Sequence, residues 1–271
     1  VEVKGSKRWL DFYFFRLQPI EIVKPFFILI TAKILSDERI KEINLGYFLS
    51  FLILLSILIL LFFQPDLGQS ILLIFTWISI IFIAGLSIII IFTLLGLSLA
   101  AVSSLVLIFP ERFGYIVNRL ISFLDPAKGD SFQSQKALEA IRQGGLKGQG
   151  MGEGILKENV PEAHTDYIIS VISEEFGSII SIILILLFLY ISYRIIKVSI
   201  LEKDKNIKIS LCGLTSLLIF QTFIHIGVNT SLLPTTGMTL PFLSYGGSSL
   251  FGSGILAGII LNYTRSRILH E

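Results

Sequence analysis

Charged residues and cysteines are both scarce in this chain. Asp, Glu, Lys and Arg make up 15% of its 271 residues, against 53% for hydrophobic residues, whereas soluble domains are typically about 25% charged. Its one cysteine, Cys212, has no partner for an intrachain disulfide. A soluble globular domain and a disulfide-stapled scaffold are therefore excluded. The mean hydropathy of +0.80 predicts a polytopic membrane protein instead.

Seven apolar segments approach the length of about 20 residues that a helix needs to cross a bilayer. They are continuous rather than alternating, which favours helices over the strands of a barrel. We predict an all-α polytopic membrane protein with about seven transmembrane helices, forming a single membrane domain over residues 1–271. The predicted spans are 17–35, 45–63, 70–86, 87–109, 176–198, 209–228 and 245–263.

Lysine and arginine are concentrated in short loops on one side of these spans, and the positive-inside rule makes that side cytoplasmic. The connections at 64–69, 110–165 and 229–244 then lie outside. The residues that set this orientation are Lys33, Arg39, Lys41, Arg194, Lys197, Lys203, Lys205, Lys208, Arg265 and Arg267.

Residues 110–165 form a long extracytoplasmic loop in this topology. Apolar residues recur at helical spacing from Phe113 to Leu124, which predicts an amphipathic helix at the membrane interface, ended by Asp125 and Pro126. A second helix is predicted from Asp130 to Gly144. The loop also carries seven Lys or Arg residues. They either pair with acidic neighbours in the loop or bind an anionic substrate such as a phosphate.

Two glycine-containing segments stand out in the outer loops. The run GGLKGQGMGEG, residues 144–154, follows no strand and lacks a GKS or GKT ending, so we do not interpret it as a nucleotide site. Its glycines predict sharp turns beside a neighbour or a ligand. Residues 229–249, with two prolines and three glycines, are predicted to re-enter the membrane or line a cavity.

Several ionisable residues lie in or beside apolar segments, where they are costly unless paired or functional. Glu21 and Lys24 are three residues apart and predict a structural ion pair. Asp66 precedes a helix and is expected to cap it. At least one carboxylate of the Glu174 and Glu175 pair is expected to face a polar cavity. His225 is interpreted as an interior residue rather than a metal ligand.

Six motifs, taken in order from Lys4 to about Tyr263, resemble the signatures of the shape, elongation, division and sporulation (SEDS) family of bacterial membrane glycosyltransferases. They are KGSKRW, LQPIEIVK, QPDLGQS, SFLDP, PEAHTDYIISVISEEFG and LPTTGMTLPFLSYGGSS. Ala163 makes PEAHTD more similar to the division members than to the elongation members. Family members have about ten spans, so the resemblance implies that about three N-terminal helices are missing here, in line with Val1 in place of an initiator methionine.

The resemblance implies a peptidoglycan polymerase in the bacterial cytoplasmic (inner) membrane, with its active site on the extracytoplasmic face at the division septum. Its substrate would be lipid II, the undecaprenyl-pyrophosphate-linked disaccharide pentapeptide. The family's essential loop aspartate falls on Asp166, which would act as general base in an inverting transfer. The implied partners are a class B penicillin-binding transpeptidase, other division proteins and membrane lipid, with no nucleic acid.

The predicted substrate-binding residues lie in or beside the outer motifs; they are Arg8, Lys136, Arg142, Lys147, His164, Thr165, Ser244 and Tyr245. Any metal is predicted to be Mg²⁺ or Mn²⁺, held by Asp166 and substrate oxygens, and no organic cofactor is expected. The alternative function is a transporter that flips lipid II or another polar lipid. The nearly apolar run Ile179 to Tyr190 favours the enzyme, because a flippase needs a polar path across the bilayer.

Overall fold

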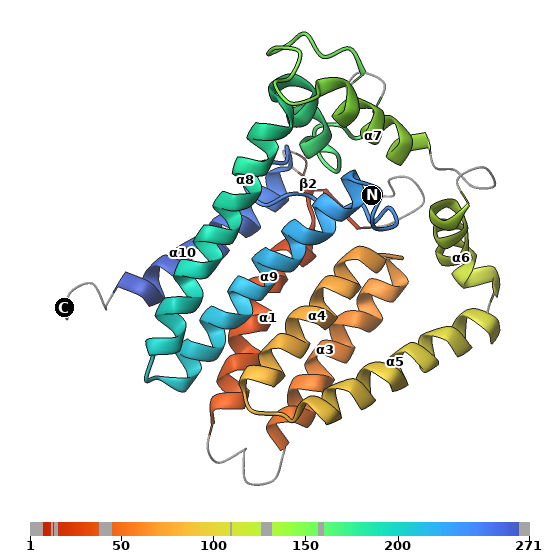
Figure 1. The fold of residues 1–271 in the computed structure, drawn as a ribbon. Coiled ribbons are helices and arrows are strands. Elements are labelled where there is room, and N and C mark those ends of the chain that lie inside the picture. The colour runs from red at the N-terminus through yellow and green to blue at the C-terminus, as the bar shows by residue number, and fades with distance from the viewer. Residues whose placement is uncertain are drawn as a thin grey trace. The chain divides into compact units, whose positions relative to one another are not determined.

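A computed structural model describes residues 8–11, 13, 16–37, 45–108, 110–125, 132–156 and 160–265. These residues are mostly helical, with one short antiparallel ribbon (Figure 1). By contacts between residues the chain divides into two compact units. The first unit comprises 1–85, 185–222 and 238–271, and the second comprises 86–184 and 223–237. The single membrane domain stays a prediction.

Helix α1 (Pro19–Ser36) is central to the first unit. It packs against α3 (Leu45–Phe63), α4 (Leu67–Ile83) and α10 (Gly247–Arg265) (Figure 1). The contact with α10 is close because Gly252 has no side chain: a Cβ there would lie 2.5 Å from the carbonyl oxygen of Glu21. Small residues allow such approaches between membrane helices.

The chain enters α1 through a short antiparallel ribbon of two strands. Strand β1 (Leu10–Asp11) pairs with β2 (Arg16–Leu17), with Leu10 opposite Leu17. Helix α1 then begins with a proline, whose missing N–H costs nothing in a first turn. At the start of α4, Asp66 accepts a hydrogen bond from the Gln69 N–H at 3.3 Å, so the predicted cap is confirmed.

Each of the seven predicted spans coincides with a helix. Besides α1, α3, α4 and α10, these helices are α5 (Ile88–Ile108), α8 (Ile168–Leu201) and α9 (Lys205–Asn229). Within the described residues, α3, α8 and α9 are long and apolar enough to cross a membrane, while α4 and the first part of α5 are shorter apolar helices. The chain is thus a mostly helical membrane protein, and the count of seven spans stays a prediction.

In the second unit, α5 packs against α6 (Pro110–Leu124), the amphipathic helix predicted from sequence. Several of its apolar residues are exposed, and Val117, Leu120, Ile121 and Leu124 among them lie on one face of the helix, as expected for a helix whose apolar face meets a membrane surface. Phe123 is exposed as well. Helix α7 (Phe132–Gly144) ends at the predicted glycine, and its predicted start at Asp130 lies outside the described residues.

The glycine-rich segment 144–154 lies against α8 at a break in that helix. Gly177 has φ 85° and ψ 168°, which interrupts the helical path. The N–H groups of Gln149 and Gly150 donate to the carbonyl oxygens of Glu174 and Glu175 at 2.9 and 3.0 Å. A Cβ on Gly148 would lie 2.2 Å from the Glu175 carbonyl oxygen. The glycines therefore serve a close approach to a neighbouring helix, one of the two predicted alternatives.

The two adjacent carboxylates of α8 also bind this segment. Fully buried Glu174 accepts a hydrogen bond from the Leu156 N–H at 2.8 Å, and Glu175 accepts one from the Gly152 N–H at 3.3 Å. The buried Glu174 carboxylate is therefore satisfied by a backbone N–H group, which a turn leaves available. That at least one carboxylate of the pair faces a polar cavity stays a prediction.

Candidate active site around Asp166

Asp166 lies at the end of a tight turn that leads into α8. The carbonyl oxygen of Glu162 accepts hydrogen bonds from the N–H groups of Thr165, Asp166 and Tyr167 at 3.1, 3.0 and 3.3 Å. Glu162 itself has φ 59°, an uncommon backbone conformation for a residue with a side chain. The turn places the Asp166 carboxylate partly exposed, two residues before the first residue of α8. A helix N-terminus favours negative charge nearby.

Asn229, the last residue of α9, fixes the main chain of this turn. Its side chain is fully buried. Its Nδ2 donates to the carbonyl oxygens of Asp166 at 3.0 Å and His225 at 2.8 Å. Its Oδ1 accepts from the Ser170 N–H at 3.2 Å and from the Ser170 hydroxyl at 2.8 Å. Three of these four bonds tie the end of α9 to Asp166 and Ser170 at the start of α8, and the fourth, to His225, stays within α9.

The segment that follows α9 borders the carboxylate itself. A Cβ built on Gly237 would lie 3.4 Å from Asp166 Oδ2, and the φ of +69° at Gly237 favours glycine. Two residues earlier, the Thr235 carbonyl oxygen accepts a hydrogen bond from Arg119 Nη1 of α6 at 3.0 Å. The sequence motifs PEAHTD and LPTTG are therefore brought together in the second unit, with an arginine from the long loop.

The phenol of Tyr167 lies close enough to the Asp166 carboxylate and the Arg119 guanidinium for both charges to affect its pKa. Burial raises the pKa of its phenol above the ordinary value, the negative charge of Asp166 raises this pKa further, and Arg119 opposes the shift. Tyr167 therefore stays protonated at neutral pH. Its ring is 2% exposed and anchors the turn next to Asp166.

The other predicted residues of the second unit lie in the same turn or on the loop. Thr165 Oγ1 donates to the main-chain and side-chain oxygens of Glu162, and His164 is exposed beside it. Lys136 pairs with Glu139 at 2.6 Å on α7. Arg142 in the last turn of α7 and Lys147 in the glycine-rich segment are both exposed. The loop cations are thus partly paired and partly presented to solvent.

Arg8, Ser244 and Tyr245 belong to the first unit. Arg8 donates to the carbonyl oxygens of Gln64 and Pro65 and lies 3.5 Å from Asp66. Its guanidinium thus fixes the turn formed by residues 64–66, which precedes α4. Burial raises the pKa of Asp66, and Arg8 opposes that shift.

The LSYGG motif itself forms a turn in this unit. The Leu240 N–H donates to buried Ser244 Oγ at 2.7 Å, while Tyr245 is 84% exposed. Ser244 therefore has a structural bond in addition to any role toward substrate.

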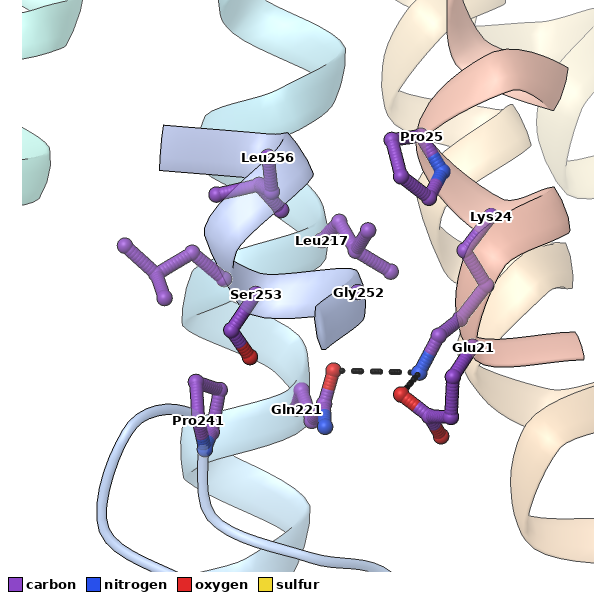
Figure 2. Close-up of a pocket in the computed structure, with 10 residues that line it drawn as sticks. Glu21, Lys24, Pro25, Leu217, Gln221, Pro241, Gly252, Ser253 and Leu256 are labelled. Carbon is purple, nitrogen blue, oxygen red and sulfur yellow. Dashed lines mark hydrogen bonds and ion pairs between the residues drawn. The ribbon is translucent and has the colours of Figure 1, made fainter. Parts of the chain in front are cut away.

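The predicted ion pair is present in the core of the first unit. Lys24 Nζ lies 2.8 Å from Glu21 Oε2, and both side chains are buried. Gln69 of α4 donates to the other oxygen of Glu21 at 2.7 Å, and Gln221 of α9 accepts from Lys24 at 3.3 Å. Figure 2 shows the pair beside a cavity of about 10 Å³, room for about one water molecule. Pro25, Pro241, Gly252 and Ser253 contribute to its lining.

Within the described ranges, no three His, Cys, Asp or Glu side chains form a group that could hold a metal ion. A carboxylate oxygen is nevertheless a ligand that Mg²⁺ and Mn²⁺ accept, commonly with substrate phosphates completing the shell. The residues present fit a cation shared with a substrate rather than one held by the protein alone.

Fold and site together define a helical membrane protein with a partly exposed carboxylate whose main chain is fixed by a buried amide. The family model described as cell cycle protein, named for FtsW, RodA and SpoVE, matches residues 1–268. The chain is 39% identical over 264 residues to a probable peptidoglycan glycosyltransferase FtsW of Caulobacter vibrioides, covering 97% of this chain and 67% of that protein. It is 37% identical to the protein of the same description from Pseudomonas fluorescens, covering 96% of this chain and 65% of that protein.

A solved structure shares the fold. It is described as a peptidoglycan synthase complex that coordinates polymerization and crosslinking, and one of its chains matches with a TM-score of 0.79 and 27% identity, over 98% of this chain and 75% of that one. The chain therefore belongs to the SEDS family of peptidoglycan glycosyltransferases and is FtsW-like within it. It spans about two thirds of the length of the two curated relatives.

Sequence reasoning missed three residues that the structure places at or near these sites. Arg119 was one of seven loop cations with no reason to be preferred. Asn229 and Gln221 are amides in an apolar helix, and that is the signal that could have found them, because a polar side chain in a membrane span needs a partner.

Proposed function

We propose that this protein polymerises lipid II into glycan strands, with Asp166 as the general base. The observation that carries the proposal is the placement of Asp166. Its main chain is fixed by Asn229, its carboxylate is partly exposed beside Gly237, and Arg119 lies on the same unit. The names of the curated relatives, which are peptidoglycan glycosyltransferases, support the reaction class.

The proposed reaction is a direct displacement. The 4-hydroxyl of the N-acetylglucosamine of an incoming lipid II attacks the anomeric carbon of the growing chain. The new glycosidic C–O bond forms as the bond to the undecaprenyl pyrophosphate breaks, and Asp166 accepts the hydroxyl proton. Such a base contributes about 10²- to 10⁴-fold in rate. Because an α-linked donor gives a β-linked product, the reaction inverts and needs no covalent glycosyl-enzyme.

The leaving pyrophosphate gains negative charge, so cations near Asp166 stabilise the transition state. Arg119 is the strongest candidate, since the segment it binds also borders the carboxylate. Exposed Arg142 and Lys147 are further candidate cations. His164 and Thr165, in the Asp166 turn, are candidates for hydrogen bonds to the substrate. Mg²⁺ or Mn²⁺, when bound by Asp166 and substrate oxygens, would neutralise part of the pyrophosphate charge.

The setting of the reaction is proposed to be the outer face of the inner membrane at the division septum, with a class B penicillin-binding transpeptidase as partner. Three described helices able to cross a membrane support the localisation. The similar chain from a complex that coordinates polymerization and crosslinking supports a crosslinking partner. The FtsW-like sequence supports a role in division.

The test compares Asp166→Asn with Glu162→Gln, a matched removal of a carboxylate charge in the same turn. Purified protein and its transpeptidase are incubated with labelled lipid II, and the products are resolved on a gel. Asp166→Asn should lower polymerisation by about 10²-fold or more, and Glu162→Gln should retain it within a few-fold. Chain growth by Asp166→Asn at the wild-type rate would remove Asp166 as base. Transfer of lipid II across liposomes without glycan formation would favour the transporter.

A further inference from the structure

Gln221 joins two parts of the first unit through the two ends of its side-chain amide. The residue lies on α9 and is 4% exposed. Its Oε1 accepts a hydrogen bond from Lys24 Nζ at 3.3 Å, and its Nε2 donates to the Thr239 carbonyl oxygen at 3.0 Å. Figure 2 shows this amide facing the Lys24 and Glu21 side chains. One amide therefore serves a buried ammonium and an outer-loop carbonyl at once.

The network behind Gln221 extends to a third helix. Glu21 accepts from Gln69 of α4 at 2.7 Å and pairs with Lys24 at 2.8 Å on α1. All four side chains are at most 4% exposed. A buried polar network that is well satisfied is rigid, because each broken bond leaves a polar group without water to replace its partner. Thr239 is thus tied to three packed helices rather than to one side chain.

Thr239 is two residues along the chain from Gly237, which borders the Asp166 carboxylate. Two residues span at most about 7 Å of extended chain, so a fixed Thr239 restricts the path of Gly237. Thr239 Oγ1 also shares a hydrogen bond with Ser249 Oγ at 2.7 Å, at the start of α10. Anchoring at Thr239 therefore bears on the segment beside the proposed base.

We propose that Gln221 is a positioning residue, whose amide transmits the order of the buried Glu21–Lys24 pair to the Gly237–Thr239 segment. The expected effect of Gln221 on catalysis rests on the proposed function. The order of the Gly237–Thr239 segment does not, and it can be measured separately. Gln221 touches no reacting atom and acts through Thr239.

Two substitutions, Gln221→Glu and Gln221→Met, distinguish the hydrogen bond at Oε1 from the one at Nε2. Glutamate keeps an acceptor for Lys24 and, ionised beside that ammonium, cannot donate to Thr239. Methionine has similar size and makes neither bond. The matched control is Thr215→Val on the same helix, because the hydroxyl of buried Thr215 bonds, among the residues that the structure describes, only to the Leu211 carbonyl of its own helix.

Hydrogen–deuterium exchange of peptides covering residues 234–244 is the first readout. Exchange should increase several-fold in Gln221→Glu and Gln221→Met, and should stay at the wild-type rate in Thr215→Val. The second readout is kcat and KM for lipid II at a temperature where all variants are folded. A small displacement of an active-site segment can cost about 10²-fold, so kcat should fall strongly with little change in KM.

Unchanged exchange in Gln221→Glu would overturn the proposal, whatever the activity. Raised exchange with wild-type kcat would remove the catalytic role. A wild-type protein that does not polymerise lipid II would refute the proposed function while leaving the exchange result standing. A double-mutant cycle that combines Gln221→Met with Lys24→Met tests whether Gln221 acts through the ion pair. The effects of the two substitutions on exchange should be non-additive, and additivity would show that Gln221 acts without the ion pair.

Discussion

The charged residues of the two units are held in different ways. In the first unit, Glu21 and Lys24 are buried and satisfy one another together with Gln69 and Gln221. In the second unit, Asn229 holds Asp166 through its main-chain carbonyl, and the carboxylate stays partly exposed. The first arrangement uses side-chain charge to build structure. The second uses a buried amide to hold the main chain of a partly exposed carboxylate.

The largest effect that this comparison predicts is on stability, at the buried pair. Lys24→Met leaves Glu21 charged and without its ammonium, and breaking a buried pair costs about 3–5 kcal/mol. Glu21→Gln with Lys24→Met should recover much of that loss, because no unpaired charge remains. Thermal unfolding in detergent measures both. Equal destabilisation by the single and double variants would contradict the pairing.

The next effect is on activity, at the amide that holds the proposed base. Asn229→Asp keeps the acceptor for Ser170 but cannot donate to the Asp166 and His225 carbonyl oxygens. Misplacement of a catalytic group can cost about 10²-fold, so kcat for lipid II polymerisation should fall by that order. Thr230→Val, which removes the hydroxyl's bonds to the Ile226 and Gly227 carbonyl oxygens of α9, is the control. Wild-type kcat in Asn229→Asp would show that Asp166 needs no such support.

A smaller effect is expected at the arginine near the site. Arg119→Gln removes the charge but keeps an amide donor for the Thr235 carbonyl. Hydrogen bonds to charged groups are worth about 1.5–3 kcal/mol, so kcat/KM should fall by about 10- to 10²-fold. Arg194→Gln, an exposed arginine of the first unit that bonds to the Tyr190 hydroxyl, should change little. Equal losses in both would assign the effect to general charge.

The smallest effect concerns Asp66. Burial raises the pKa of Asp66 above its ordinary value, so the folded protein binds this proton more tightly than the unfolded chain does. The resulting stability is fully present below the ordinary pKa of 3.8 and is lost as pH rises through the folded-state value.

Asp66→Asn should weaken the pH dependence of the folding stability and keep the cap of α4, since asparagine caps helices well. Thermal unfolding measured from about pH 4 to pH 7 tests the sign. A wild-type melting temperature that rises more steeply with pH than that of the variant would contradict it.

The sequence was informative wherever local spacing decides the outcome. Hydropathy located the helices, the three-residue spacing of Glu21 and Lys24 predicted their pair, and Asp66 and Gly144 were predicted to bound helices. The amphipathic pattern of the long loop located α6 because helical periodicity is a property of neighbouring residues.

Contacts between distant segments were not predictable in this way. Asn229 and Asp166 are 63 residues apart, and Gln221 and Lys24 are 197 apart. The hydrogen bond from the Leu156 N–H to Glu174 was not predictable either, because the sequence does not show that this part of the loop lies against α8. Arg119 was indistinguishable from the other loop cations until α6 was placed. The family resemblance, and not spacing, pointed to Asp166.

The hydrogen bonds between the glycine-rich segment and α8 have a mechanical consequence. Four backbone N–H groups of residues 149–156 donate hydrogen bonds to Glu174 and Glu175, within three turns of the start of α8 at Ile168. The donors are Gln149, Gly150, Gly152 and Leu156. If the N-terminal part of α8 tilts during a catalytic cycle, the loop travels with it as one body. Lys147 and Asp166 would then keep their separation, so the geometry between the proposed base and a candidate cation would survive such a motion.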